Sequence, residues 1–474
     1  MIAASSGLVV AGPAARVVRG LRQVSTLGAA EGGEVRRFVS RPDLTPPSLA
    51  VVRPAHGAAR GLVFLAPSSG PGARGAMIVD EAGELVWFHP VAHKAVADFK
   101  VGLYRGKPVL TWWEGKTVQG LADGEWVVVD SSYRELLRFS AASGRHADLH
   151  ELVLTSDGTA LVTSNETVTW DLRSVGGSRR GQVVGGVVQE VALPSGRLVR
   201  EWRSLEHVAV DETQVKSAPG PRFDYFHVNS VDVAPDGNLI ISARNTWAAY
   251  KVNRRTGRII WRLGGRRSDF ALGRGARFEW QHDVREHAHG VVSVFDNAAA
   301  PAEEPESRAL LLSLDLKRMR ASLEHAYVHR PDPVLSHFLG NAQLLAGGNV
   351  FVGWGGSPYL TEFTAAGAIA FDARLPYGGQ SYRAFRFPWV GRPAGRPSLA
   401  ARGGVLYASW NGATEPASWQ LLEGAGAQDL RSGATVRRTG FETVLTPASQ
   451  TRRAAVVALD RSGAPLGTSP AVDV

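Results

Sequence analysis

The chain has 474 residues, of which 44% are apolar and 20% charged, with a formal net charge of +9 and no cysteine. This balance fits a globular protein. The missing cysteines exclude disulfides, thiolate metal sites and a cysteine nucleophile, and no run approaches the roughly 18 apolar residues of a membrane-spanning helix.

The positive charge comes mainly from arginines scattered through turns such as "RRTGR" and "GGRRSDF". No continuous basic helix or arm is present, so nucleic acid is not the expected partner. An anionic small molecule is compatible with the charge.

Residues 1–40 read as a tail of small residues and arginines. The apolar run near the start resembles the remnant of a signal peptide, with a disordered tail as the equal alternative. The expected location is therefore secreted or in the cell envelope, with the cytoplasm left open.

From about residue 60 the chain consists of short β-like runs separated by glycine turns. Four segments share one plan: a polar start, alternating apolar residues, a turn glycine eight residues after the start, and a second strand. They are residues 150–165, 229–244, 282–297 and 340–355, with weaker copies at 98–113 and 61–88.

Further strand pairs follow these hairpins, which gives about six units of four strands each. Such repetition predicts an all-β chain with a six-bladed β-propeller over residues 41–394. A pair of β-sandwiches is the structural alternative. Residues 395–474 predict a small fibronectin III-like or immunoglobulin-like β-sandwich, with Trp410 early and an "ALDRSG" turn late.

The repeat geometry places the polar starters at one mouth of the propeller channel. His150, Asn229, His282 and Asn341 would form a ring. Asn165, Arg244 and Asn297 end the paired strands and would lie beside it. Side chains two apart on a strand share a face, which adds His227 and Trp280, whereas His287 and His289 fall at the far turn and are expected to be solvated.

Three histidines with an arginine and amides suit acid, base or nucleophilic work on a sulfuryl or phosphoryl group. No Walker loop or magnesium-binding carboxylate cluster is present, which disfavours nucleotide chemistry. Trp113, Trp247 and Trp280 are candidates for holding an aromatic substrate, and blade packing is the alternative for them.

The motifs "DLHELVLTSDGTALV", "FHVNSVDVAPDGNLIISARNT", "FEWQHDV" and "GNAQLLAGGNVFVGWG" resemble the arylsulfotransferase family over about residues 60–390, and "GKPVLTWWEG" is similar to its actinobacterial branch. The resemblance implies a six-bladed propeller that moves a sulfuryl group from a phenolic sulfate ester to a phenolic acceptor. It implies no nucleotide sulfate donor, no cofactor, and a ping-pong route through a sulfated histidine.

By this resemblance His282 matches the sulfated histidine, and His227 with Asn229 matches the His-x-Asn pair. Arg244 matches the arginine that binds sulfuryl oxygens, and His150 the remaining histidine. Characterised bacterial members carry an immunoglobulin-like domain at the N-terminus, whereas the sandwich expected here is C-terminal. The oligomeric state is left open.

Two other functions stay open from the sequence. The propeller is compatible with a non-catalytic binding module for a cell-surface ligand, since fold alone does not define function. The three histidines are also compatible with a zinc hydrolase, although no carboxylate partners for them stand out in the sequence.

Overall fold

Antiparallel sheets make up nearly all regular structure in the computed structural model, which describes residues 34–118, 121–216, 220–426 and 428–474. Over these residues no α-helix occurs, and no helix is long and apolar enough to cross a membrane. The short 3-10 helices are η2 (Arg173–Val175), η3 (Ser204–Glu206), η4 (Val210–Glu212), η5 (Arg244–Thr246) and η6 (Ala288–Gly290).

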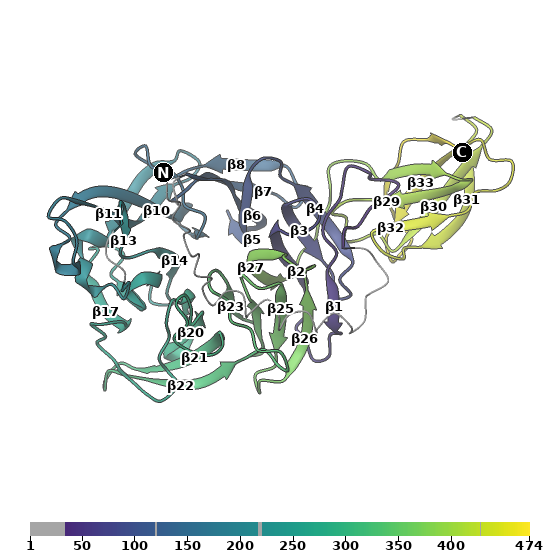
Figure 1. Cartoon of the computed structure of the whole chain (residues 1–474). Coiled ribbons are helices and arrows are strands. Elements are labelled where there is room, and N and C mark those ends of the chain that lie inside the picture. The colour runs from purple at the N-terminus through teal and green to yellow at the C-terminus, as the bar shows by residue number, and fades with distance from the viewer. Residues whose placement is uncertain (1–33, 119–120, 217–219, 427) are drawn as a thin grey trace, which may run out of the picture. The chain divides into compact units, whose positions relative to one another are not determined.

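Six sheets follow one another between residues 50 and 387 (Figure 1). The first has the order β27–β2–β3–β4: β27 (Gln380–Phe387), β2 (Leu62–Ser69), β3 (Gly75–Val79) and β4 (Leu85–Pro90). The second is β5–β6–β7–β8: β5 (Ala95–Tyr104), β6 (Lys107–Val118), β7 (Leu121–Val129) and β8 (Glu135–Phe139). The third is β12–β11–β10–β9, with β13 beside β11: β9 (Leu152–Leu154), β10 (Thr159–Trp170), β11 (Gly181–Ala192), β12 (Arg197–Arg203) and β13 (Phe223–Asp224).

The other three sheets continue in chain order. The fourth is β14 (Val228–Val233), β15 (Leu239–Ala243), β16 (Ala248–Val252) and β17 (Ile259–Gly264). The fifth is β18–β22–β21–β20–β19: β18 (Ala271–Leu272), β19 (His282–Glu286), β20 (Val291–Asp296), β21 (Arg308–Asp315) and β22 (Arg320–Tyr327). The sixth is β1–β26–β25–β24–β23: β1 (Ala50–Arg53), β23 (Asn341–Leu344), β24 (Val350–Gly353), β25 (Tyr359–Phe363) and β26 (Ile369–Arg374).

The hairpins expected at 98–113, 150–165, 229–244, 282–297 and 340–355 are each present as antiparallel pairs. Their turns need glycine where φ is positive, as at Gly158 (φ 73) and Gly237 (φ 80), because a Cβ disfavours that conformation. The segment 61–88 differs, since it supplies β2, β3 and β4 while the fourth strand of that sheet is β27, from much later in the chain.

Apolar side chains fill the spaces between consecutive sheets. Val63, Leu65 and Met77 of the first sheet pack with Phe351 and Phe371 of the sixth. Five further clusters each join two consecutive sheets, from the first and second to the fifth and sixth. Alternation on each strand places apolar residues against both neighbouring sheets, so each sheet is buried on both faces.

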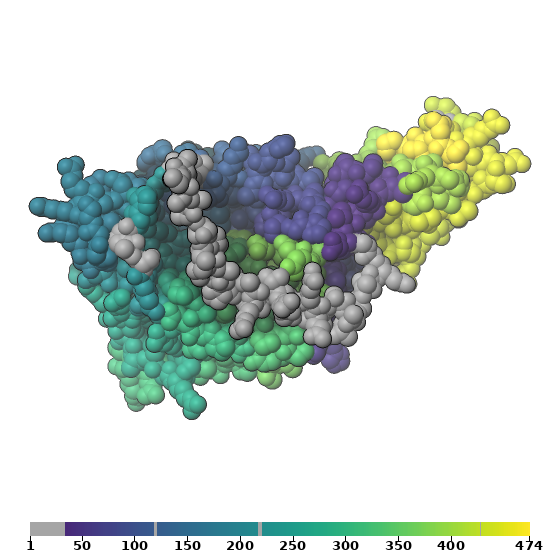
Figure 2. Space-filling model, in the orientation of Figure 1, coloured from purple at the N-terminus to yellow at the C-terminus, as the bar shows by residue number. Residues whose placement is uncertain are grey.

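Early and late segments of the chain lie side by side. Strand β27 pairs with β2, and β1 pairs with β26. The same adjacency is visible where purple atoms of the first strands meet light green atoms of the last ones (Figure 2). The edge strands β27, β5, β9, β14, β19 and β23 each contact the next in this order, and β23 contacts β27.

The last 80 or so residues form two further sheets. One is β28 (Ser398–Arg402), β29 (Val405–Ser409) and β32 (Glu442–Leu445). The other is β31–β30–β33–β34, with β35 beside β33: β30 (Ser418–Gly424), β31 (Arg431–Arg437), β33 (Arg453–Leu459), β34 (Pro465–Thr468) and β35 (Val472–Asp473). Buried residues of both sheets, including Leu406, Trp419 and Val456, form one core.

Most of the expected N-terminal tail, residues 1–33, lies outside the described residues. Residues 34–40 are described and make contacts. Arg36 pairs with Glu84 at 2.7 Å, and the Phe38 ring lies 4.4 Å from that of Phe441. The Ser40 amide donates to the Glu442 carboxylate at 2.7 Å. These contacts tie residues 34–40 to the folded unit.

Candidate active site

His282 is the first residue of β19 and is 1% exposed. Its Nδ1 lies 2.7 Å from the amide oxygen of Asn297. The amide nitrogen of Asn297 donates to the carbonyls of Ser336 at 3.0 Å and Leu339 at 2.9 Å, which orients the amide. Since the oxygen of Asn297 can only accept, Nδ1 of His282 carries the proton and Nε2 carries the lone pair.

Burial lowers the pKa of His282 well below its usual 6.5, and the nearby positive charge of Arg244 lowers it further. The hydrogen bond to Asn297 opposes this effect only in part. His282 is therefore a neutral imidazole at neutral pH, with a free nitrogen lone pair.

His150 precedes β9, and its ring centroid lies 6.4 Å from that of His282. Its Nδ1 contacts the Asp148 carboxylate, which also accepts from the Asn165 amide at 2.8 Å. Burial opposes the charge of Asp148, but the two neighbouring imidazoles, His150 first, hold its pKa below the usual value. An ionised Asp148 therefore accepts a hydrogen bond from Nδ1 of His150 and orients the imidazole.

His227 lies just before β14, and its ring centroid is 5.1 Å from that of His150. Its Nδ1 lies 2.6 Å from the Asp224 carboxylate, and its backbone N–H donates to the same group at 2.9 Å. Its φ of 53° is unusual for a residue with a side chain. The two Asp224 contacts hold the backbone and the imidazole of His227 in place. The distances between the rings show that the three histidines form one cluster.

Arg244 begins η5, directly after β15. Its backbone N–H donates to the His227 carbonyl at 3.0 Å, which places the two residues on adjoining strand ends. The guanidinium lies 4.7 Å over the Trp280 ring and donates to the Asn245 side chain at 3.1 Å. Burial lowers the pKa of Arg244 to about 10, so it stays cationic at neutral pH.

Asn229 is fully buried at a register shift between β14 and β15. Its amide nitrogen donates to the Gln281 carbonyl at 2.6 Å, directly before His282. Its amide oxygen is buried and has no hydrogen-bond partner among the described residues. An unpaired buried acceptor is costly, which is typical of a site that completes its hydrogen bonds with a ligand.

Two tryptophans lie beside Arg244. The Trp247 and Trp280 rings meet edge to face at 5.2 Å, and both backbones have positive φ, 53° and 56°. Their buried indole N–H groups have no partner within the described part of the chain. Backbone strain and unpaired donors in one place favour a binding role over packing.

A pocket of about 490 Å³ opens next to the cluster. Asp224, Arg244 and Trp280 line it together with Lys216, Arg222 and the apolar Pro301. Its size, one aromatic wall and a cationic side suit a small aromatic anion.

The other predicted residues make different contacts. Trp113 is fully buried and donates to the Ala147 carbonyl at 2.9 Å within an apolar cluster, so the structure does not bring it to the histidines. Asn341 bonds to the backbone of Ala384. His289 is exposed, whereas His287 is half-buried and bonds to Ser293 at 2.9 Å, so the expectation that it is solvated was wrong.

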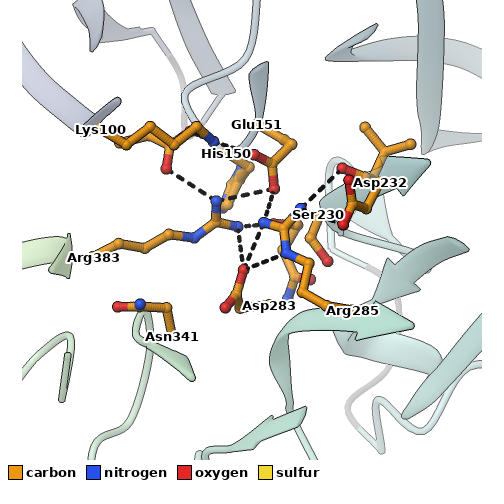
Figure 3. A network of polar contacts seen from close by, with 12 residues as sticks. Lys100, His150, Glu151, Ser230, Asp232, Asp283, Arg285, Asn341 and Arg383 are labelled. Atoms are coloured by element: carbon orange, nitrogen blue, oxygen red, sulfur yellow. Dashed lines mark hydrogen bonds and ion pairs between the residues drawn. The ribbon is translucent and has the colours of Figure 1, made fainter. Parts of the chain in front are cut away.

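A charged network adjoins the histidine cluster (Figure 3). Its members are Lys100, Arg285 and Arg383 with Asp98, Glu151, Asp232 and Asp283. Burial alone would raise the pKa of Glu151, but the charges of Arg285, Arg383 and Lys100 lower it to about 2. The members come from the edge strands β5, β14, β19 and β27 and from the residue before β9, so the network ties these strands together.

Sequence reasoning missed Asp148 and Asp224, and with them the carboxylate partners of two histidines. The available signal was an acidic residue two or three positions before each histidine, in "DLH" and "DYFH". Carboxylate partners also suit zinc-binding histidines. However, the described residues contain no group of three His, Cys, Asp or Glu side chains placed to hold a metal ion.

Residues 100–375 match a family model described as Arylsulfotransferase (ASST), which covers more than half of the chain. No curated protein matches the sequence.

Solved structures give only distant likeness. A protein of unknown function from Bacteroides caccae is 13% identical with a TM-score of 0.43, covering 69% of this chain and 98% of that one. A catalytically inactive virginiamycin B lyase from Staphylococcus aureus with quinupristin is 7% identical with a TM-score of 0.38, covering 77% and 96%. These scores are too low to carry an argument.

Proposed function

Because the chain belongs to the arylsulfotransferase family, we propose that it moves a sulfuryl group from a phenolic sulfate ester to a phenolic acceptor, without a nucleotide sulfate donor. The observation that carries the proposal is the state of His282: neutral, with Nδ1–H donating to Asn297 and the Nε2 lone pair available. A neutral imidazole with a fixed tautomer is suited to nucleophilic attack.

In the first half-reaction, Nε2 of His282 attacks the sulfur of the ester. The N–S bond forms as the S–O bond to the phenol breaks, and Nδ1 keeps its proton on Asn297. Arg244 and the free indole N–H groups beside it stabilise the negative oxygens of the sulfuryl group.

The leaving phenolate takes a proton from a protonated histidine. We assign this acid to His227, since its partner Asp224 lines the pocket, with His150 as the deeper alternative. Asp224 stabilises the imidazolium that donates the proton. In the second half-reaction an acceptor phenol returns its proton to the same imidazole and takes the sulfuryl group from His282, which restores the starting state.

Mixing the protein with p-nitrophenyl sulfate in the absence of acceptor tests the proposal. Intact-protein mass should increase by one sulfuryl group as one equivalent of nitrophenol appears. His282→Ala should form neither, whereas His289→Ala, seven residues away on an exposed turn, should behave as the unaltered protein. Transfer by His282→Ala would refute the assignment, and stoichiometric binding of the ester without turnover would favour a binding module.

The finer fold assignments belong to the same proposal. The six sheets with their interleaved cores support a six-bladed β-propeller over residues 41–394, and the two last sheets support a fibronectin III-like sandwich over 395–474. Membership of the actinobacterial branch and location outside the cytoplasm stay predictions, and the segment that bears on location, residues 1–33, lies outside the described residues.

A further inference from the structure

Tyr382, on β27, reaches the backbone of two site residues. Its hydroxyl lies 3.1 Å from the carbonyl of His150 and 3.2 Å from the carbonyl of Asn229, so one proton is shared between two acceptors. Its ring meets the His150 imidazole edge to face, with centroids 5.5 Å apart. Tyr382 is 2% exposed and far from His150 in the sequence.

Arg383 adds a second connection to the same place. Its Nη2 donates to the Asn229 carbonyl at 3.1 Å, and its Nη1 donates to Asp98 and Glu151 at 2.9 Å each. Glu151 directly follows His150 in the chain. Figure 3 shows the guanidinium of Arg383 facing that of Arg285, with Glu151 and Asp283 between them. Arg383 therefore joins the charged network to the backbone of the site.

The hydrogen bonds from Tyr382 and Arg383 hold backbone that regular sheet pairing does not hold. His150 precedes β9, and Asn229 lies at the register shift of β14, so neither has a regular ladder on both sides. The two residues come from different sheets, and β27 from a third. The Tyr382 hydroxyl on β27 is thus a donor that both carbonyls share.

We infer that Tyr382 and Arg383 are positioning residues, which set the distance between the His150 imidazole and the Asn229 amide for sulfuryl transfer. This inference rests on the proposed function. Neither residue lines the pocket beside Arg244, so they act through His150 and Asn229 and not on the substrate. A displacement of about 1 Å in such a site is enough to slow the chemical step about 100-fold.

Tyr382→Phe keeps the ring and removes the shared proton. We expect kcat for p-nitrophenyl sulfate to fall about 10-fold to 100-fold, while KM stays within about twofold. Tyr327→Phe is the matched control, because Tyr327 is also 2% exposed and lies on the outer strand β22. Its hydroxyl likewise donates to a carbonyl, that of Ala365 at 3.4 Å. The control should keep both constants.

The imidazole nitrogen resonances give a readout that does not need turnover. In isotope-labelled protein, Tyr382→Phe should shift the signals of His150 and leave the Nδ1–H signal of His282 in place. Arg383→Lys, which keeps the charge but loses the second donor, should shift them in the same way. Unchanged His150 signals in both variants would overturn the inference.

The kinetic constants of Tyr382→Phe also test the positioning role. An unchanged kcat in Tyr382→Phe, a changed KM alone, or a lower melting temperature with normal kcat would each overturn the positioning role. If the unaltered protein transfers no sulfuryl group, the proposed function fails, and the nitrogen signals then decide the inference by themselves.

Discussion

The histidine cluster and the charged network use neighbouring residues for opposite purposes. His150 is followed by Glu151, and His282 by Asp283, so each strand start contributes one residue to the cluster and the next to the network. Successive side chains on a strand point to opposite faces. One local sequence therefore builds both regions.

The two regions differ in how fully their polar atoms are paired. In the network every carboxylate faces a cation, and Glu151 faces three. Among the described residues, Nε of Arg383 is the buried network atom that lacks a partner. In the cluster, the Asn229 oxygen and the indole N–H groups of Trp247 and Trp280 have no partner in the described chain. The network therefore serves stability, whereas the cluster keeps unsatisfied atoms for a ligand.

Arg285→Met tests the network half of this comparison. Arg285 faces Glu151, Asp283 and Asp232, so its loss leaves buried carboxylates without a partner. We expect a loss of about 3–5 kcal/mol of unfolding free energy, measured by urea titration. Arg318→Met is the control, since an exposed ion pair such as Arg318–Asp315 contributes little to stability. Equal losses in the two variants would contradict the structural role of the network.

Arg244→Met tests the cluster half. In the described residues Arg244 contacts the Asn245 side chain, the His337 carbonyl and the Trp280 ring, and no carboxylate. Its loss should therefore leave stability within about 1 kcal/mol of the original. The value of kcat/KM should fall about 100-fold to 1000-fold, because a cation that stabilises the transition state is gone. Arg318→Met, at the exposed pair with Asp315, should keep the activity. A stability loss like that of Arg285→Met would erase the distinction.

Asn297→Asp changes the charge beside the nucleophile. A carboxylate at this position favours protonated His282 and should raise its pKa. Since protonated Nε2 cannot attack, the acid limb of the rate of nitrophenol release should move to higher pH. A stopped-flow pH profile of the first half-reaction measures this. An unmoved acid limb would show that the titrating group is not His282.

The smallest expected effect is a difference in pH dependence: His282 and Glu151 should lose their contributions to stability in different pH ranges. The folded pKa of His282 lies below its unfolded value of 6.5, so the unfolded chain binds the extra proton between them. Stability from this residue is complete above pH 6.5 and falls as the pH drops below it, by at most about 1.4 kcal/mol per unit. Glu151, with a pKa of about 2 against 4.5, should lose its contribution only below about pH 4.5.

Urea titrations of His282→Gln and Glu151→Gln, each subtracted from the unaltered protein across pH 4 to 7.5, would measure the two windows. A flat difference for His282→Gln between pH 6.5 and 5 would contradict its lowered pKa.

The sequence alone determined the repeating hairpins and the residues that form the histidine cluster. Period-2 alternation and turn glycines are local signals, so the strands of 150–165 or 229–244 follow from their own residues. Equivalent places in the repeats also pointed to His150, Asn229 and His282. The same reasoning could not tell Trp113 from Trp280, because both are buried aromatic residues and only their contacts separate them. Trp113 packs in an apolar cluster, whereas the guanidinium of Arg244 lies over the Trp280 ring.

Only the tertiary structure decided which polar atoms meet. The tautomer of His282 depends on Asn297, which in turn depends on the carbonyls of Ser336 and Leu339. Likewise, Tyr382 reaches His150 only because β27 pairs with β2 and contacts β5, which in turn contacts β9. Hydrogen bonds act over about 3 Å, whereas sequence patterns report on neighbours along the chain. Contacts between distant segments are therefore invisible until the sheets are assembled.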